Sequence, residues 1–286
     1  MEITVVTAAP AVEAIANILL ECRSGGVAEE ATPSGHVLLR GYLPVGPATH
    51  VTLSAIKDRI RTLPGYGLDT GPATVETEEI EDEGWAHAWK IHFKPFPVGR
   101  LWITPTWDRT LPPSGAVVIE LDPGMAFGSG LHPSTQMVLQ LLSRLRGGET
   151  VFDVGTGSGI LAIAAAKLGA GRVLARDNDP VAVEVARHNV AYNRVDDRVA
   201  VEEGDLLRGV DGQAHLILAN LIADIHLDFL PGALPSLLPN GMVAASGIIA
   251  DRVLEVETVA RAAGFKVAES LRSGEWRCAI LSRPGS

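Results

Sequence analysis

The chain has 286 residues, of which 47% are hydrophobic and 20% are charged, and its formal net charge is −10. This length suits one large domain or two unequal ones, and no apolar run approaches the ~20 residues that span a bilayer. The negative charge argues against a direct nucleic-acid partner and favours a basic one.

Two cysteines are too few for a disulfide framework or a metal cluster, and an acid, Glu2, stands where a secretory signal would carry positive charge. We therefore expect a cytoplasmic protein with no membrane segment and no bound metal. We also expect it to be a monomer.

Residues 1–82 are predicted to form a small α+β domain. Strand-like runs occupy residues 3–8, 26–31, 36–43 and 73–80, and apolar residues at helical spacing fall within residues 11–23 and 49–63. The resulting order, βαββαβ, is that of ferredoxin-like domains. RNA-recognition domains share this order, but their aromatic strand motif fails here at Leu43 and Pro44, so we do not expect RNA binding.

A linker helix is predicted over residues 83–97. Trp85, Trp89 and His92 fall at helical spacing there, and Pro95 and Pro97 end the pattern. An aromatic helix face of this kind is suited to packing between two domains. A surface that faces the substrate is the alternative.

The most informative stretch begins at residue 150. A predicted strand over residues 150–154 leads into the glycine turn GTGSG, residues 155–159, and then into a helix that stops at Gly169. Strand, turn and helix form half of a doubly wound sheet, in which glycines let the backbone approach a ligand closely. Enzymes that bind NAD place a further glycine where this chain has Ile160.

A second strand ends in Asp177, 22 residues after Gly155, where an acid can accept hydrogen bonds from ribose hydroxyls. Both features require a ribose and neither requires a diphosphate. Asp153, just before the glycines, suits a cationic ligand. The set favours S-adenosylmethionine over NAD, and a dinucleotide oxidoreductase is kept as an alternative from another class.

The rest of the chain continues the α/β alternation. A third strand ends near Asp205, where an acid can reach an adenine amino group, and a fourth ends at Asn220. Further strands are predicted over residues 241–249, 265–275 and 276–283, the last two as a hairpin. Ligands of such sheets bind at the carboxyl ends of the strands, where Gly155, Asp177, Asp205 and Asn220 all fall.

Five segments together resemble the PrmA family, which methylates the eleventh large-subunit ribosomal protein. They are WAHAWKIHFKPFPVGRLWITPTW, LDPGMAFGSGLHPST, VFDVGTGSGILAIAAAKLGA, DNDP and NLIA, in family order and at family spacing. The resemblance implies a Rossmann-like class I methyltransferase domain over residues 98–286, preceded by a small ferredoxin-like α+β domain over residues 1–82 that recognises the substrate.

The same resemblance implies S-adenosylmethionine as the cofactor and the basic ribosomal protein as the partner. It implies that Thr135 contacts the cofactor, that Gly155 lies under it, that Asp177 binds the ribose and that Asn220 sits near the point of methyl transfer. The chain departs from the family at Leu131, which replaces a threonine. No catalytic residue is identified, and His132 either orders its loop or acts as a base.

The expected reaction is methyl transfer to lysine side-chain and/or N-terminal amines. Asn220 is followed by Leu-Ile-Ala and not by the Pro-Pro-Tyr of enzymes that methylate planar amides or nucleobase amines, which favours a flexible amine. A methyltransferase of the same fold that acts on another protein's lysines is the main alternative. A binding module without turnover is a further one.

Overall fold

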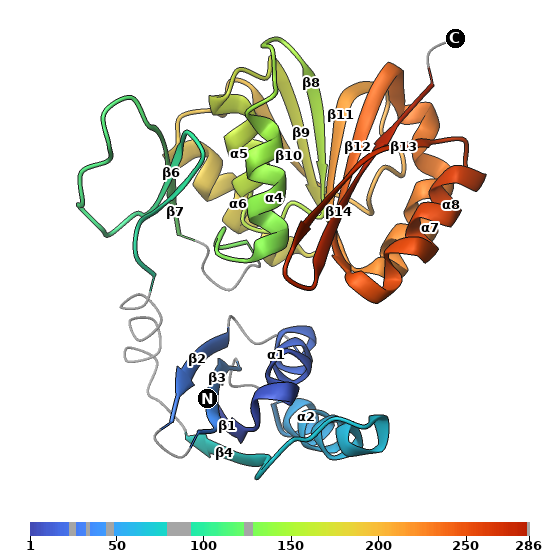
Figure 1. The fold of residues 1–286 in the computed structure, drawn as a ribbon. Coiled ribbons are helices and arrows are strands. Elements are labelled where there is room, and N and C mark those ends of the chain that lie inside the picture. The colour runs from blue at the N-terminus through green and yellow to red at the C-terminus, as the bar shows by residue number, and fades with distance from the viewer. Residues whose placement is uncertain (23–26, 33–34, 44–48, 79–92, 123–127, 285–286) are drawn as a thin grey trace. The chain divides into compact units, whose positions relative to one another are not determined.

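The computed structural model describes the chain except for residues 23–26, 33–34, 44–48, 79–92, 123–127 and 285–286. It contains two compact units, Met1–Phe93 and Lys94–Ser286, which we call unit 1 and unit 2. Each is described by itself (Figure 1). Within the described ranges, every helix is too short or too polar to cross a membrane.

Unit 1 is built on a four-stranded antiparallel sheet in the order β2-β3-β1-β4. This is the ferredoxin-like order that the sequence predicts. Two short 3-10 helices, η1 and η2, follow β1 and α2. The elements are β1 (Glu2–Thr7), η1 (Ala9–Ala11), α1 (Val12–Glu21), β2 (Val27–Ala31), β3 (Val37–Tyr42), α2 (Thr49–Thr62), η2 (Leu63–Tyr66) and β4 (Thr74–Glu78).

The core of unit 1 lies between this sheet and the two helices. Alternate residues of β1 are buried because successive side chains of a strand point to opposite faces of the sheet. The apolar stripes of the two helices complete the core, as their spacing predicts. Its members include Ile3, Val5, Ile15, Ile18, Leu19, Leu39, Ile56 and Ile60.

Most of the predicted linker helix, residues 83–97, falls outside the described residues. The part that is described differs from the prediction. Residues 93–95 form no helix, and Phe96–Val98 is strand β5 of unit 2. The reason is local, because Pro95 and Pro97 have no backbone N–H to give to a helix.

Unit 2 contains a seven-stranded sheet in the order β10-β9-β8-β11-β12-β14-β13 and a three-stranded sheet in the order β5-β6-β7. In the larger sheet, the first five strands are parallel and β14 is antiparallel to both its neighbours. The first elements are β5, β6 (Leu101–Pro105), β7 (Val117–Leu121), α4 (Pro133–Leu142), β8 (Thr150–Val154), α5 (Ile160–Lys167), β9 (Arg172–Asp177) and α6 (Pro180–Tyr192).

The remaining elements of unit 2 complete the sheet and its helices. They are β10 (Val199–Glu203), β11 (Ala214–Asn220), α7 (Ala223–Ala233), η3 (Leu234–Ser236), β12 (Leu237–Ile249), η4 (Ala250–Arg252), α8 (Val253–Ala262), β13 (Lys266–Ser273) and β14 (Trp276–Ser282). The hairpin predicted for the last two strands is present.

Helices cover both faces of the large sheet (Figure 1). Phe152 and Val154 of β8 share a buried apolar cluster with residues of α7 and α8. Asp153 lies between them in sequence, so it points to the opposite face, where its carboxylate accepts the Ala162 N–H of α5. Helix α5 is buried along nearly its whole length, which explains its unbroken apolar sequence.

The sheet brings three strand ends to one level. Val154 of β8 pairs with Arg176 of β9 on one side and with Ala219 of β11 on the other. The residues that come next, Gly155, Asp177 and Asn220, therefore lie along a single edge. The arrangement predicted from the sequence is confirmed for these three residues.

Candidate functional site

The glycine turn leaves β8 in a conformation that side chains resist. Gly155, Gly157 and Gly159 have φ of 70°, 54° and 83°. The amides of Gly155 and Thr156 both donate to the Arg176 carbonyl at 2.9 Å, which fastens the turn to the end of β9. The turn thus presents bare backbone at the carboxyl edge of the sheet, where a ligand can lie against it.

Asp177 is fixed by the backbone around it. Its Oδ2 accepts the Gly157 N–H at 2.9 Å, and its Oδ1 accepts the Asp179 N–H at 3.0 Å. Each carboxylate oxygen has a further lone pair, so both can still accept hydrogen bonds from neighbouring hydroxyls. The next acid, Asp179, caps α6 through the Val181 N–H.

Thr135 and Asn220 are in direct contact. Pro133 opens α4, so Thr135 lies in the first turn of the helix. The Asn220 Nδ2 donates to the Thr135 Oγ1 at 3.0 Å, which joins the end of β11 to α4. This bond uses the amide nitrogen of Asn220 and leaves its Oδ1 as an acceptor. The sequence indicates both residues but not their contact.

Gly247, which the sequence analysis did not single out, makes room for that contact. Its φ is 81°, and a Cβ there would lie 3.0 Å from the Asn220 Oδ1 and 2.6 Å from the Leu221 carbonyl oxygen. A side chain at this position would therefore displace Asn220. The Ser-Gly pair near the end of a strand was the one available signal.

The described part of the glycine loop before α4 lies against the glycine turn. Gly128 and Gly130 have φ of 115° and 84°, and the Gly128 carbonyl accepts the Ser158 hydroxyl at 2.6 Å. A Cβ at Gly130 would lie 2.7 Å from Ile160. These two glycines are needed because the two loops touch. Phe127, in the same loop, lies outside the described residues.

His132 orders the loop in which it stands. It is the N-cap residue of α4, with its Nδ1 2.6 Å from the Ser134 Oγ and 3.3 Å from the Ser134 N. Its ring meets Trp276 of β14 edge-on, with the ring centroids 4.5 Å apart. Burial lowers the pKa of the ring. These contacts support the first of the two roles considered for His132.

A buried polar network lies behind this edge of the sheet. The Ser246 Oγ donates to the Ser134 carbonyl at 2.9 Å, and the Ser246 carbonyl accepts from the Leu221 N–H at 3.0 Å. The His226 Nε2 donates to the same carbonyl at 2.8 Å. Burial lowers the pKa of His226 to about 4, so its ring is neutral at pH 7. The network holds α4, β11 and α7 together.

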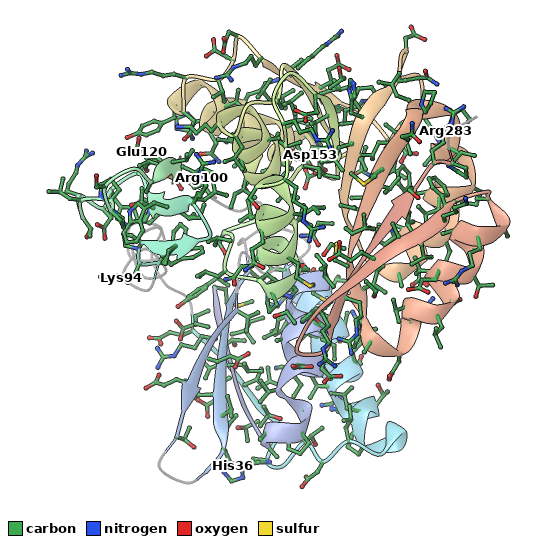
Figure 2. All side chains as sticks on the ribbon, turned by 45° about the horizontal axis from the view of Figure 1, so that its top comes forward. His36, Lys94, Arg100, Glu120, Asp153 and Arg283 are labelled. Carbon is green, nitrogen blue, oxygen red and sulfur yellow. The ribbon has the colours of Figure 1, made fainter. Side chains whose placement is uncertain are left out.

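Asp153 is a buried acid whose hydrogen-bonding capacity is only partly used by the fold. It is 1% exposed, and its Oδ2 accepts the Thr156 hydroxyl at 2.7 Å and the Ala162 N–H at 3.1 Å. Among the described residues, its Oδ1 has no hydrogen-bond partner. Figure 2 shows this residue inside unit 2. Because its Oδ1 is itself buried, this carboxylate would act on a cationic ligand at the glycine turn, such as a sulfonium compound, through its charge and not by direct contact.

Desolvation by burial raises the pKa of the Asp153 carboxyl to about 7. The hydrogen bonds from Thr156 and Ala162 oppose this shift, and the nearby charge of Asp177 adds to it. A substantial fraction of the carboxyl is therefore protonated near neutral pH. A cation that binds beside it would favour the ionised form.

The sheet order, the glycine turn and the acid at the end of β9 together define an S-adenosylmethionine-dependent methyltransferase of class I. The sequence model of one family, described as Ribosomal protein L11 methyltransferase (PrmA), matches residues 1–284. The chain belongs to this family.

Individual relatives agree with the assignment. The chain is 40% identical over 307 aligned positions to the ribosomal protein L11 methyltransferases of Bacillus cereus strain Q1 and of Bacillus anthracis, with 99% of this chain and 98% of each relative covered. A crystal structure of a ribosomal protein L11 methylase from Lactobacillus delbrueckii subsp. bulgaricus is 35% identical, with a TM-score of 0.60, and covers 67% of this chain and 99% of its own. Membership of this family rules out the dinucleotide oxidoreductase.

Cofactor binding is expected to change the protonation of Asp153. S-adenosylmethionine carries positive charge, so its binding should lower the pKa of this carboxyl and release a proton. Affinity should then rise about tenfold between pH 6 and pH 8, because protonation competes with binding below a pKa of about 7. Calorimetry in buffers of different ionisation enthalpy measures both the affinity and the proton release.

Asp153→Asn is the matched variant, since an amide oxygen can still accept from Thr156 and Ala162. It should bind more weakly at pH 8 and show no proton release. Equal proton release in the variant and the wild type would assign the titration to another group.

Proposed function

We propose that the chain transfers methyl groups from S-adenosylmethionine to lysine side-chain and/or N-terminal amines of ribosomal protein L11. The contact between Asn220 and Thr135 carries this proposal. It holds an amide oxygen at the edge of the sheet beside the glycine turn and Asp177. Family membership over residues 1–284 supports the identity of the substrate.

Four residues are proposed to bind the cofactor. The backbone of Gly155 lies under it, because no Cβ blocks the approach. Asp177 accepts from the ribose hydroxyls with the lone pairs that Gly157 and Asp179 leave free. Thr135, which belongs to α4, lines the opposite side of the site. Asn220 lies where the cofactor meets the amine that accepts the methyl group.

The cofactor supplies a methyl group bound to a positively charged sulfur. The reaction then needs a neutral amine whose nitrogen approaches in line with the carbon–sulfur bond, and positioning contributes most of the rate. The Asn220 Oδ1 accepts an N–H of the amine and so directs the nitrogen lone pair towards the methyl carbon. When bound, the cofactor would donate the methyl group and keep the bonding electrons on sulfur, and the product ammonium would lose its proton to solvent.

The charge of the chain supports a basic substrate. A net charge of −10 attracts a lysine-rich protein and repels polyanions. We infer that the enzyme acts as a cytoplasmic monomer and binds neither nucleic acid nor membrane directly. We also infer that residues 1–82 recognise the substrate, while residues 98–286 bind the cofactor and carry out the transfer.

A direct assay tests the proposed substrate. Purified enzyme and S-adenosylmethionine should add mass in steps of one methyl group to purified ribosomal protein L11. Peptide mass spectrometry should place these additions on lysines or on the N-terminus. If other basic proteins are methylated and L11 is not, the alternative substrate assignment is correct.

Two further variants separate cofactor binding from turnover. Asp177→Ala should weaken cofactor binding by at least tenfold, because each lost hydrogen bond to a charged group costs about 1.5–3 kcal/mol. Asn220→Ala should mainly slow the reaction, by about a hundredfold, since a reacting atom that shifts by an ångström costs that much.

Calorimetry and single-turnover methylation at saturating cofactor measure the two effects. A wild-type single-turnover rate in Asn220→Ala would return this residue to a purely structural role. Unchanged affinity in a folded Asp177→Ala variant would remove Asp177 from the cofactor site.

A fragment of residues 94–286 tests the division of labour between the units. Unit 2 has its own core and all four proposed cofactor residues, so the fragment should bind S-adenosylmethionine as the full chain does. It should methylate L11 at least tenfold more slowly at low substrate concentration, because the recognition unit is missing. A fragment with the full-length rate would show that recognition lies in unit 2.

A further inference from the structure

A buried arginine supports the turn that follows β10. Arg176 stands in β9 directly before Asp177 and is 8% exposed. Its Nη1 donates to the carbonyl oxygens of Leu206 and Arg208, both at 2.9 Å. The turn at residues 204–208 therefore lies on a side chain from the same strand end that carries the proposed ribose acid.

Gly204 allows this packing. A Cβ at Gly204 would overlap the guanidinium of Arg176, so any larger residue would push the guanidinium away. The Gly204 N–H also donates to the Asp177 carbonyl at 2.8 Å. The turn is thus fastened twice, to the side chain of Arg176 and to the backbone of Asp177.

The turn presents Asp205, the acid that the sequence places within reach of an adenine. The Arg208 N–H donates to the Asp205 carbonyl at 3.0 Å, and the Arg208 Nη1 lies 2.7 Å from the Asp205 Oδ2. Leu206 has a φ of 49°, which is unfavourable for a side chain that is not glycine and persists only where the surroundings impose it. The two carbonyls that Arg176 holds lie on this residue and two residues after it.

Stability alone does not explain the arginine. Leu206, Leu207 and Val210 already pack against the large apolar cluster of unit 2, so the turn has an anchor of its own. The Arg176 Nε is buried without a hydrogen-bond partner among the described residues, and Glu202 lies 3.9 Å from it. A charge buried with incomplete pairing costs desolvation free energy that an apolar residue would avoid.

We propose that Arg176 is a positioning residue for the nucleobase. By holding the carbonyls of Leu206 and Arg208, it sets the Asp205 carboxylate where it accepts from the adenine amino group. One strand end, Arg176 and Asp177, then governs recognition of both the base and the ribose. This inference rests on the proposed function, because it takes the adenosyl group as the ligand.

The test compares the affinities of two ligands that differ only in the base, because the loss of a purely structural residue would not change the ratio of these affinities. The probes are S-adenosylhomocysteine and its deaminated, inosyl analogue, in which a carbonyl oxygen replaces the amino group. A carboxylate that accepts from the amino group repels that oxygen, so the wild type should bind the adenosyl compound at least tenfold more tightly. Asp205→Ala should reduce this ratio to within about threefold of unity.

Arg176→Met should reduce the ratio of the two affinities to the same extent as Asp205→Ala does. The double variant should reduce this ratio no further. Arg176→Lys, which keeps one donor group, should restore part of it. Arg198→Gln is the matched control, because Arg198 also donates to a backbone carbonyl, that of Ala166 at 2.8 Å, at the C-terminal end of α5. It should leave the ratio unchanged.

A second variant, and a measurement without ligand, cover the case in which Arg176→Met folds poorly. Gly204→Ala displaces the guanidinium but keeps the arginine, and it should also lower the ratio. In both variants, the amides of residues 205–210 should exchange hydrogen at least tenfold faster than in the wild type, while those of β8 and β11 keep their protection.

The outcomes separate the two proposals. If the wild type discriminates and Arg176→Met discriminates equally, or loses affinity for both probes alike, Arg176 is a structural residue and this inference is wrong. If Asp205→Ala keeps the wild-type ratio, the inference also falls, because Asp205 is not the base acceptor. If the wild type binds neither probe, the proposed function fails and this inference fails with it.

Discussion

The site depends on where β9 stops. The Arg176 carbonyl, directly before Asp177, accepts hydrogen bonds from two amides of the glycine turn. The Asp177 carboxylate accepts one from a third amide. These bonds keep a backbone with three left-handed glycines in one conformation, which an isolated turn of that composition would not hold. The glycine turn and the turn beyond β10 are both fastened to two consecutive residues, Arg176 and Asp177, so a displacement of this strand end would move both turns together with the proposed ribose acid.

A second joint, a set of hydrogen bonds between α4 and strands β11 and β12, fixes the other side of the site. Asn220 at the end of β11 bonds to Thr135 in the first turn of α4, and Ser246 bonds to the neighbouring Ser134 carbonyl. Both joints are made of buried or half-buried polar groups, which makes them directional where apolar packing is not. The apolar clusters stabilise the fold, and these hydrogen bonds define the position of a few atoms within it.

Much of this arrangement follows from sequence pattern because strand ends are marked by residue type. The glycines after residue 154, Asp177 and Asn220 each terminate an apolar run, and parallel strands place such termini at one edge. The contributions of Gly247, Ser246 and His226 were not predicted. Their roles come from contacts between residues that are 20 or more positions apart in sequence. Nothing local in the sequence distinguishes them from ordinary core or turn residues. The prediction for residues 93–97 was wrong because it extended the linker helix up to the two prolines that end the helical pattern, whereas Phe96–Val98 forms strand β5.

The edge contact between His132 and Trp276 has a consequence for biosynthesis. It joins the cap of α4 to the start of β14, a strand that is inserted between β12 and β13. During translation, the strands from β8 to β12 are synthesised before this tryptophan is made. The loop before α4 therefore gains this contact only after the hairpin of β13 and β14 has been synthesised and has paired. A nascent chain stalled before Trp276 would have most of the sheet without the ring contact that helps to order this loop.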